Sequence, residues 1–231
     1  MPTPDVRLLV LRHGRSEWNA VRRWQGRFDS PLDVVGRAQA TAVADELAGL
    51  GERWSRPTSS TLGRAAETAA IIAARLGLEP PTLDERLVEA HAGEWQGLTP
   101  AEIEAAYPGW LAAHRRPEGF EPLERVVARA TAALLDVAHT TPDGSSALVV
   151  SHSGLIRSVV RSLGLTDTRI PNLGGVWFRL PTGDRSATGR LRLVVDELFD
   201  PHGVVVSGVD APGEDPGEQS DQREHHGRAE R

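Results

Sequence analysis

Residues 7–16 read Arg-Leu-Leu-Val-Leu-Arg-His-Gly-Arg-Ser, and this stretch decides the fold. Residues 7–11 form a short apolar run, which is typical of a buried strand. The run ends abruptly in the polar residues Arg12 and His13, followed by Gly14. In α/β proteins, ligands bind beyond the carboxyl ends of such strands. We therefore expect a functional site where this strand ends.

A second apolar run, residues 147–150, ends in the same way, in Ser151-His152-Ser153-Gly154. The other elements expected from the pattern are helices over 33–50, 62–76, 100–107, 122–139 and 155–163, a weaker strand over 54–59, and late strands over 176–180 and 191–198. Because strands alternate with helices, the sequence predicts an α/β fold with a mostly parallel sheet.

The composition excludes several kinds of chemistry. The chain has 231 residues, its 26 basic side chains are all Arg, and it contains no Cys. There is therefore no Lys for a phosphate-binding loop or a Schiff base, no Cys nucleophile and no disulfide. The net charge is −6, but residues 210–231 hold seven acidic residues and three Arg. The nearly balanced remainder argues against a nucleic-acid-binding surface.

We expect one catalytic domain over residues 1–206 and a disordered acidic tail over 207–231, because the tail has scarcely any apolar side chain. His225 and His226 lie in this tail, and we interpret them as solvated rather than as metal ligands. No apolar run reaches the length of a membrane span, and the N-terminus lacks the pattern of a secretion signal. These features predict a cytoplasmic protein with no membrane or nucleic-acid partner.

Two histidines follow apolar strands, His13 after the first and His152 after the late one. Parallel strands place their carboxyl ends on the same edge of a sheet, so the two side chains can meet over one cleft. Each could instead be an ordinary hydrogen-bonding residue at the start of a loop. Two histidines at equivalent strand ends favour the functional interpretation.

Arg12 and His13 suit phosphoryl transfer. The guanidinium of Arg12 offers a planar fork of donors to phosphate oxygens, and His13 can attack through a ring nitrogen. Since the chain has no Lys, a second Arg must help to neutralise the phosphoryl charge. Arg64 is the best candidate, because it lies where the weaker strand meets its helix and a helix N-terminus adds anion affinity. Considered alone, Arg64 could equally be a solvated helix residue.

Glu89 is the candidate proton donor. It lies in a segment rich in Gly and Trp, which is typical of an ordered loop. A carboxyl group there can protonate a leaving alkoxide and afterwards activate water. Glu85 and Glu94 are neighbouring alternatives that the sequence leaves open.

Four blocks of the sequence together resemble the histidine phosphatase superfamily, in its phosphoglycerate-mutase-like branch. They occur in order over residues 7 to about 180 and consist of Arg12-His13-Gly14 with Ser16-Glu17-Trp18-Asn19, Ser59-Ser60 with Arg64-Ala65, Glu89 with Gly93 and Trp95, and Ser151-His152-Ser153-Gly154. The tripeptide 12–14 alone would be a weak signal, whereas the ordered set is specific.

The resemblance implies a three-layer α/β/α sandwich and a phosphohistidine intermediate on His13. The implied roles are a phosphate pocket of Arg12, Arg64 and His152, an acid/base at Glu89, and a substrate side lined by Asn19, Gln25 and Ser153. The implied substrate is a small phosphomonoester such as a sugar phosphate or a phosphoglycerate. Neither a metal nor another cofactor is expected, and a homodimer is left open.

Three positions depart from the family pattern. Arg15 stands where Glu or Gln is common, Ser153 where Gly is common, and Gly119-Phe120-Glu121-Pro122 is a degraded Gly-Glu-Ser block. None of these changes removes a catalytic side chain. Arg15, however, is expected to add charge beside the mouth of the pocket and so to alter the substrate preference.

The same branch contains mutases and phosphatases. Mutases tend to carry Tyr and Lys at the places held here by Ala92 and Thr99, whereas Trp95 suits a phosphatase. The pair Arg115-Arg116 resembles a mutase arginine pair, but we interpret it as a solvated helix end. We therefore favour hydrolysis over a phosphoglycerate mutase activity.

Two further interpretations remain open. Ser153 could be the nucleophile of a strand-to-helix elbow, but that motif needs Gly at 151 and 155, where the chain has Ser and Leu. The domain could instead be a non-catalytic module that binds a phosphorylated ligand. Such modules usually lose the nucleophile or the acid, and both His13 and Glu89 are present here.

Overall fold

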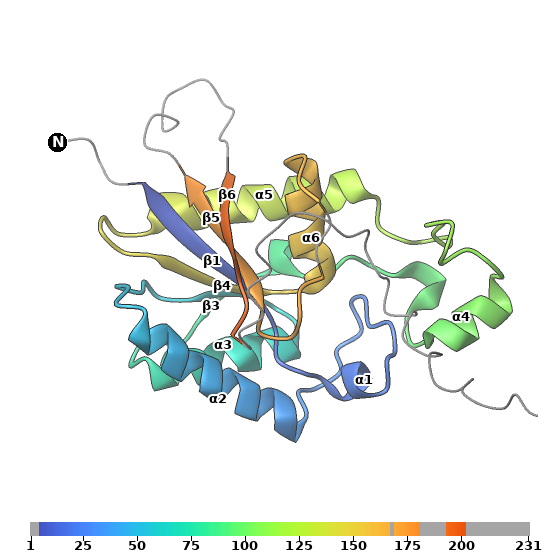
Figure 1. Cartoon of the computed structure of the whole chain (residues 1–231), viewed down its shortest axis with the longest axis horizontal. Helices are drawn as coiled ribbons and strands as arrows, with labels where there is room; N and C mark the ends of the chain where they lie inside the picture. The colour runs from blue at the N-terminus through green and yellow to red at the C-terminus, as the bar shows by residue number, and fades with distance from the viewer. Residues whose placement is uncertain (1–4, 167–168, 181–192, 202–231) are drawn as a thin grey trace, which may run out of the picture.

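A mixed sheet with strand order β3-β2-β4-β1-β5-β6 forms the middle layer of the molecule (Figure 1). The structure is a computed structural model that describes residues 5–166, 169–180 and 193–201. The predicted tail over 207–231 and the start of the strand predicted over 191–198 lie outside these residues. The described strands are β1 (Val6–Arg12), β2 (Thr58–Ser60), β3 (Thr82–Asp84), β4 (Ala147–Ser151), β5 (Gly175–Leu180) and β6 (Val194–Phe199).

Helices cover both faces of this sheet, as Figure 1 shows. They are α1 (Glu17–Ala20), α2 (Val34–Gly49), α3 (Gly63–Arg75), α4 (Pro100–Ala106), α5 (Leu123–Thr140) and α6 (Ser153–Ser162), together with short 3-10 turns over Glu85–Leu87 and Gly93–Trp95. The expected helices are therefore confirmed to within two residues at either end. The brief α1 and the two 3-10 turns were not predicted, because segments of three or four residues carry no periodic pattern.

The alternation of side chains along β1 explains the three layers. Leu8 and Val10 pack into a cluster with α5 and α6, whereas Leu9 and Leu11 pack with α2 and α3 on the opposite face. All four side chains are fully buried. A strand that is apolar on both faces must lie between two layers of helices, so the predicted α/β/α sandwich is confirmed.

The sheet is mixed, because one of its edges is antiparallel. Strands β1, β2, β3 and β4 pair in parallel, but β5 pairs antiparallel with both β1 and β6. The weaker strand expected over 54–59 was placed too early. Only 58–60 pair as β2, while Trp54 makes a single bridge to Ser146. Pro57 explains this difference, because it has no N–H to donate to a neighbouring strand.

The register of the two central strands places the site. Arg12 of β1 lies opposite Ser151 of β4, and the His13 amide donates to the Ser151 carbonyl across 3.0 Å. His13 and His152 are therefore the next residues beyond the carboxyl ends of adjacent parallel strands. A smaller aromatic cluster centred on the buried Trp95 packs beside this edge of the sheet and against α4.

Candidate active site

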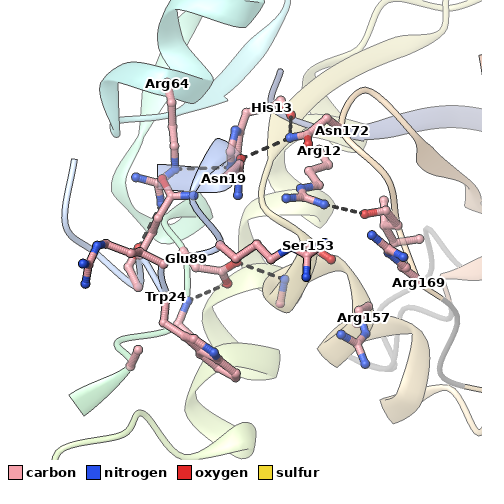
Figure 2. A pocket seen from close by; sticks show the side chains of 18 of the residues that line it. Arg12, His13, Asn19, Trp24, Arg64, Glu89, Ser153, Arg157, Arg169 and Asn172 are labelled. Atoms are coloured by element: carbon pink, nitrogen blue, oxygen red, sulfur yellow. Dashed lines mark hydrogen bonds between the residues drawn. The ribbon is translucent and has the colours of Figure 1, made fainter. Parts of the chain in front are cut away.

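A cavity of about 410 Å³ opens at the carboxyl ends of β1 and β4. Seven of the eight predicted site residues line it: Arg12, His13, Asn19, Gln25, Arg64, Glu89 and Ser153. His152 is not part of this lining, but its ring centroid is only 5.1 Å from that of His13. Figure 2 shows the side chains of Arg12, His13, Asn19, Arg64, Glu89 and Ser153 converging from separate loops and helices. The structure thus brings all the predicted residues to one place.

Hydrogen bonds fix the tautomer of His13. Its Nδ1 lies 2.7 Å from the Gly14 carbonyl, which can only accept, so Nδ1 carries the ring hydrogen. Arg64 Nε, which can only donate, lies 3.2 Å from His13 Nε2. Nε2 therefore presents a lone pair, which is the form that a nucleophilic imidazole requires.

The surroundings keep both imidazoles neutral. His13 is 3% exposed and His152 is fully buried. Burial first, and then the positive charges of Arg64 and Arg12, hold the pKa of His13 well below its ordinary range. Burial and the charge of Arg64 lower the pKa of His152 in the same way. A neutral His13 is available for attack without first losing a proton.

These lowered values predict how stability changes with pH. An unfolded chain takes up a proton on each imidazole below about pH 6.5, whereas the folded chain does not. The free energy of unfolding should therefore be retained above that pH and fall as the pH drops below it. Urea titrations from about pH 8 to about pH 5 measure this slope. The double variant His13→Gln/His152→Gln should flatten it, and an unchanged slope would contradict the assignment.

Arg64 is held rigidly beside the nucleophile. Its side chain is 1% exposed, and its guanidinium donates to the carbonyls of Phe28 at 2.7 Å and Gly26 at 2.9 Å. Burial lowers its pKa. The expected helix N-terminus is not open for an anion, because the carboxylate of Asp29 accepts from the Gly63 amide at 2.8 Å. Arg64 itself, rather than the end of α3, supplies the positive charge.

Arg12 and His152 each carry a buried polar atom without a hydrogen-bond partner among the described residues: Nε of Arg12 and Nδ1 of His152. Arg12 is anchored through a 2.9 Å bond to the Ile170 carbonyl. Ser60 accepts from the Leu62 amide and lies 2.8 Å from His152 Nε2, so its own hydrogen can point to that nitrogen. Nδ1 of His152 is then a donor. Buried donors without partners suit an anionic ligand.

Backbone amides orient Glu89. One carboxylate oxygen accepts from the Gly154 amide at 3.0 Å, and the other accepts from the Ala90 amide at 2.8 Å. Glu89 is therefore tied to the first turn of α6, directly after His152. The two alternatives lie elsewhere: Glu94 accepts from the Tyr107 hydroxyl, and neither Glu85 nor Glu94 lines the cavity. Geometry thus selects Glu89 among the three carboxylates.

Gly154 is required for this arrangement. A Cβ at position 154 would lie 2.6 Å from Glu89 Oε1. Gly154→Ala should therefore displace the carboxylate and lower kcat/KM by about ten-fold or more, since small displacements of a reacting group are costly. Circular dichroism should show a retained fold. Gly49→Ala in α2 is the matched control, because a Cβ there meets no atom within 4 Å. Equal activity of both variants would show that the position of Glu89 is unimportant.

The substrate-side residues form a linked set. Ser16 caps α1 by accepting from the Asn19 amide, and its hydroxyl donates to Gln25 at 2.9 Å. Asn172, which the sequence did not single out, donates to the His13 carbonyl at 2.9 Å and to Asn19 at 3.3 Å. It therefore fixes the backbone of His13 and the orientation of Asn19 together.

Three arginines singled out in the sequence lie outside the cavity lining. The side chain of Arg15 turns to Asp33, with Nε 2.6 Å from a carboxylate oxygen, and its effect on substrate preference stays a prediction. Arg115 and Arg116 are exposed, as expected, but they follow a turn rather than a helix. Arg115 lies over the Trp110 ring at 4.2 Å, and Arg116 packs against the aromatic cluster, so cation–π contacts hold both outside the cavity.

The site and the fold agree with the comparisons with known proteins. Residues 8–174 match the family described as the histidine phosphatase superfamily (branch 1), and the chain belongs to this superfamily.

The proteins similar to this chain include both phosphatases and phosphoglycerate mutases. The chain is 36% identical over 211 residues to the glucosyl-3-phosphoglycerate phosphatase of Mycolicibacterium vanbaalenii, covering 82% of this chain and 92% of the relative. It is 36% identical over 187 residues to the 2,3-bisphosphoglycerate-dependent phosphoglycerate mutase of a Methylobacterium species, covering 76% and 89%.

Among solved structures, a mycobacterial glucosyl-3-phosphoglycerate phosphatase in complex with VO3 superposes with a TM-score of 0.69 at 32% identity, covering 83% of this chain and 97% of that one. Residues 89–91, 95–99 and 173–175 carry a sequence resemblance to the same group of phosphatases. In the described part of the chain, no helix combines the length and apolar character needed to cross a bilayer.

Proposed function

We propose that this protein is a phosphomonoesterase that transfers the phosphoryl group of a small substrate to His13 Nε2 and then to water. The observation that carries the proposal is the neutral ring of His13 at the cavity, whose Nε2 carries a lone pair that accepts from Arg64 Nε, with Arg12 in the same lining and His152 close by. This set supplies a nucleophile and the positive field that in-line phosphoryl transfer needs. Nε2 is free to attack once Arg64 Nε turns from it to a phosphoryl oxygen.

The first step forms a bond between Nε2 and phosphorus while the bond from phosphorus to the leaving oxygen breaks. The carboxyl group of Glu89 gives its proton to that oxygen, and the alcohol leaves. Arg12, Arg64 and His152 hydrogen-bond the phosphoryl oxygens throughout. In the second step, Glu89 takes a proton from water, the oxygen attacks phosphorus, and inorganic phosphate leaves Nε2. His13 returns to its starting form.

Hydrolysis is favoured over mutase activity by the arginines outside the cavity. Arg115 and Arg116 are held by aromatic rings, so they do not add to the phosphate-binding field. A mutase must also hold a free bisphosphate and protect the phosphoenzyme from water, and the Tyr and Lys typical of mutases are replaced here by Ala92 and Thr99. The relatives named phosphatases support the same choice.

A phosphate-release screen tests the proposal. The panel contains sugar phosphates, phosphoglycerates, glucosyl-3-phosphoglycerate and nucleotides, and it runs beside a mutase assay with and without bisphosphoglycerate. We expect phosphate release from at least one small phosphomonoester and no isomerised phosphoglycerate. Isomerisation that depends on bisphosphoglycerate would identify a mutase. Binding of phosphorylated ligands without release across the panel would identify a non-catalytic module.

We further propose that the reaction needs no metal ion, because the side chains above supply the nucleophile, the charge and the proton. Full turnover after dialysis against a chelator is the expected result. A loss of turnover that Mg²⁺ or Zn²⁺ restores would contradict this part of the proposal. We also propose a cytoplasmic location, which the lack of Cys in the chain fits.

A further inference from the structure

An ion pair outside the cavity, between Arg129 of α5 and Glu121, takes no part in the chemistry proposed above. Nε of Arg129 donates to one carboxylate oxygen of Glu121 at 2.9 Å, and Nη2 donates to the other at 3.0 Å. The side chains are only 16% and 10% exposed. Burial alone would raise the pKa of Glu121, but Arg129 and then Arg27 hold it below its ordinary value. Glu121 is therefore ionised, and the pair is a charged one.

The remaining donors of Arg129 hold the backbone of the loop that carries Glu89. Nη1 donates to the Arg86 carbonyl at 2.8 Å and to the Val88 carbonyl, and Nη2 donates to the Glu89 carbonyl at 3.2 Å. A guanidinium has five N–H donors, so every donor of Arg129 is engaged by the protein. Arg129 does not line the cavity. It can therefore influence the reaction only through the groups that it holds.

Glu121 fixes the same loop on the other side of Glu89. The Glu121 amide donates to the His91 carbonyl at 2.9 Å, and its carboxylate accepts from the His91 amide at 3.3 Å. Arg27 joins the two parts, because it donates to the Glu121 carboxylate at 3.1 Å and to the Glu89 carbonyl at 3.3 Å. The backbone before and after Glu89 is thus attached to one ion pair.

The place of this loop decides where the Glu89 carboxyl group lies. One carboxylate oxygen accepts from the Ala90 amide in the loop itself, and the other accepts from the Gly154 amide in α6. Both bonds form only while the loop keeps its position relative to α6. Since a general acid must lie within hydrogen-bond reach of the leaving oxygen, a small shift of the loop should impair proton transfer.

We propose that Arg129 and Glu121 are positioning residues, which hold Glu89 where its carboxyl group can protonate the leaving oxygen of the substrate. This inference rests on the proposed function, in which Glu89 is the acid and base. Arg129 and Glu121 touch neither the substrate nor the reacting atoms. Their loss should therefore damage proton transfer and spare His13 and the phosphate-binding groups, which are held by contacts of their own.

The test compares two substrates that differ in their need for an acid. p-Nitrophenyl phosphate releases a stable phenolate, whereas the best alkyl phosphomonoester of the phosphate-release screen releases a basic alkoxide that must be protonated. The quantity compared is kcat/KM, which covers the steps up to departure of the alcohol and leaves out hydrolysis of the phosphoenzyme. Glu89→Gln supplies the reference pattern, a large loss with the alkyl substrate and a small loss with the aryl substrate.

We expect Arg129→Gln to lower kcat/KM about ten-fold or more for the alkyl substrate and less than about two-fold for p-nitrophenyl phosphate. Glu121→Gln keeps the size of the side chain, so it serves if Arg129→Gln does not fold, and it should give the same pattern on a smaller scale. Arg125→Gln is the matched control, because it removes an exposed arginine from the same helix one turn earlier. It should change neither value.

Equal losses with both substrates would overturn the inference, because the ion pair would then support the site as a whole rather than Glu89. Unchanged kcat/KM for the alkyl substrate in the folded variants would overturn it as well. Failure of the proposed function gives a different result. In that case the parent protein would release no phosphate from either compound, or Glu89→Gln itself would show no dependence on the leaving group.

Discussion

Replacing His13 with Ala is expected to lower kcat by roughly 10⁴-fold or more, the scale seen when a catalytic nucleophile is removed. The reason is specific to the geometry. The Gly14 carbonyl and Arg64 hold the ring so that Nε2 carries the lone pair, and Ala has no group that can replace it. Initial rates of phosphate release from the best substrate of the screen measure this effect.

His139→Ala is the matched control, because it removes an exposed imidazole from the last turn of α5. Its activity should equal that of the parent protein. The His13 variant should keep its circular dichroism spectrum and still bind phosphorylated ligands, since Arg12, Arg64 and His152 remain. An active His13→Ala protein would show that a different group attacks phosphorus. Ser153 would be the next candidate, although His152 Nε2 is bonded to Ser60 rather than to Ser153.

Replacing Arg64 with Ala is expected to lower kcat by about 10²- to 10³-fold, the range for removal of one preorganised group that stabilises a charged transition state. Arg64 donates to two carbonyl groups and to His13 Nε2. Its loss therefore removes charge and also loosens the loop that contains Gly26 and Phe28. Unfolding should begin at a lower temperature, so rates must be compared at a temperature where the variant is folded.

Arg64→Lys separates charge from geometry. Lys keeps the positive charge but loses the planar fork, so it should recover only part of the lost rate. Arg37→Ala, on the exposed side of α2 where Arg37 pairs with Glu67, removes an arginine from outside the cavity and should not affect kcat. If Arg64→Ala were as active as this control, the charge beside His13 would not contribute to transfer.

The position of the site could be predicted because it depends on strand ends. Apolar runs at 7–11 and 147–150 predict two buried strands, and parallel pairing places the residues that follow them at one edge. Those residues include His13 and His152, whose ring centroids are 5.1 Å apart. The three-layer arrangement could be predicted from the same apolar runs, since strands buried on both faces need helices on both sides.

The details of the cavity wall could not be predicted in the same way. The direction of Arg15 depends on Asp33, which is distant in sequence, and Asn172 reaches His13 across 159 residues. No local pattern reports such contacts. Arg157 also lines the cavity, but the helix predicted over 155–163 began after Ser153 and so gave no signal that these two side chains share a helix face. Arg169 lies in an irregular segment and gave none.

The choice between phosphatase and mutase also depends on the residues that line the cavity rather than on the fold. Both kinds of relative are 36% identical to this chain over similar lengths. His13 and its arginines are compatible with either reaction, because a phosphorylated histidine can pass its phosphoryl group to water or to a hydroxyl group. What separates them is whether water or a second hydroxyl group receives the phosphoryl group. We expect the side chains around Glu89 and the aromatic cluster to control that choice.

The most direct test of the central claim is to trap the covalent intermediate. The protein is mixed with a phosphorylated substrate, quenched within milliseconds in alkali and digested, and the peptides are analysed by mass spectrometry. We predict one phosphoryl group, labile to acid and stable to alkali, on the ring of His13. A phosphoryl group on another residue, or phosphate release with no labelled intermediate under conditions of rapid turnover, would contradict the account.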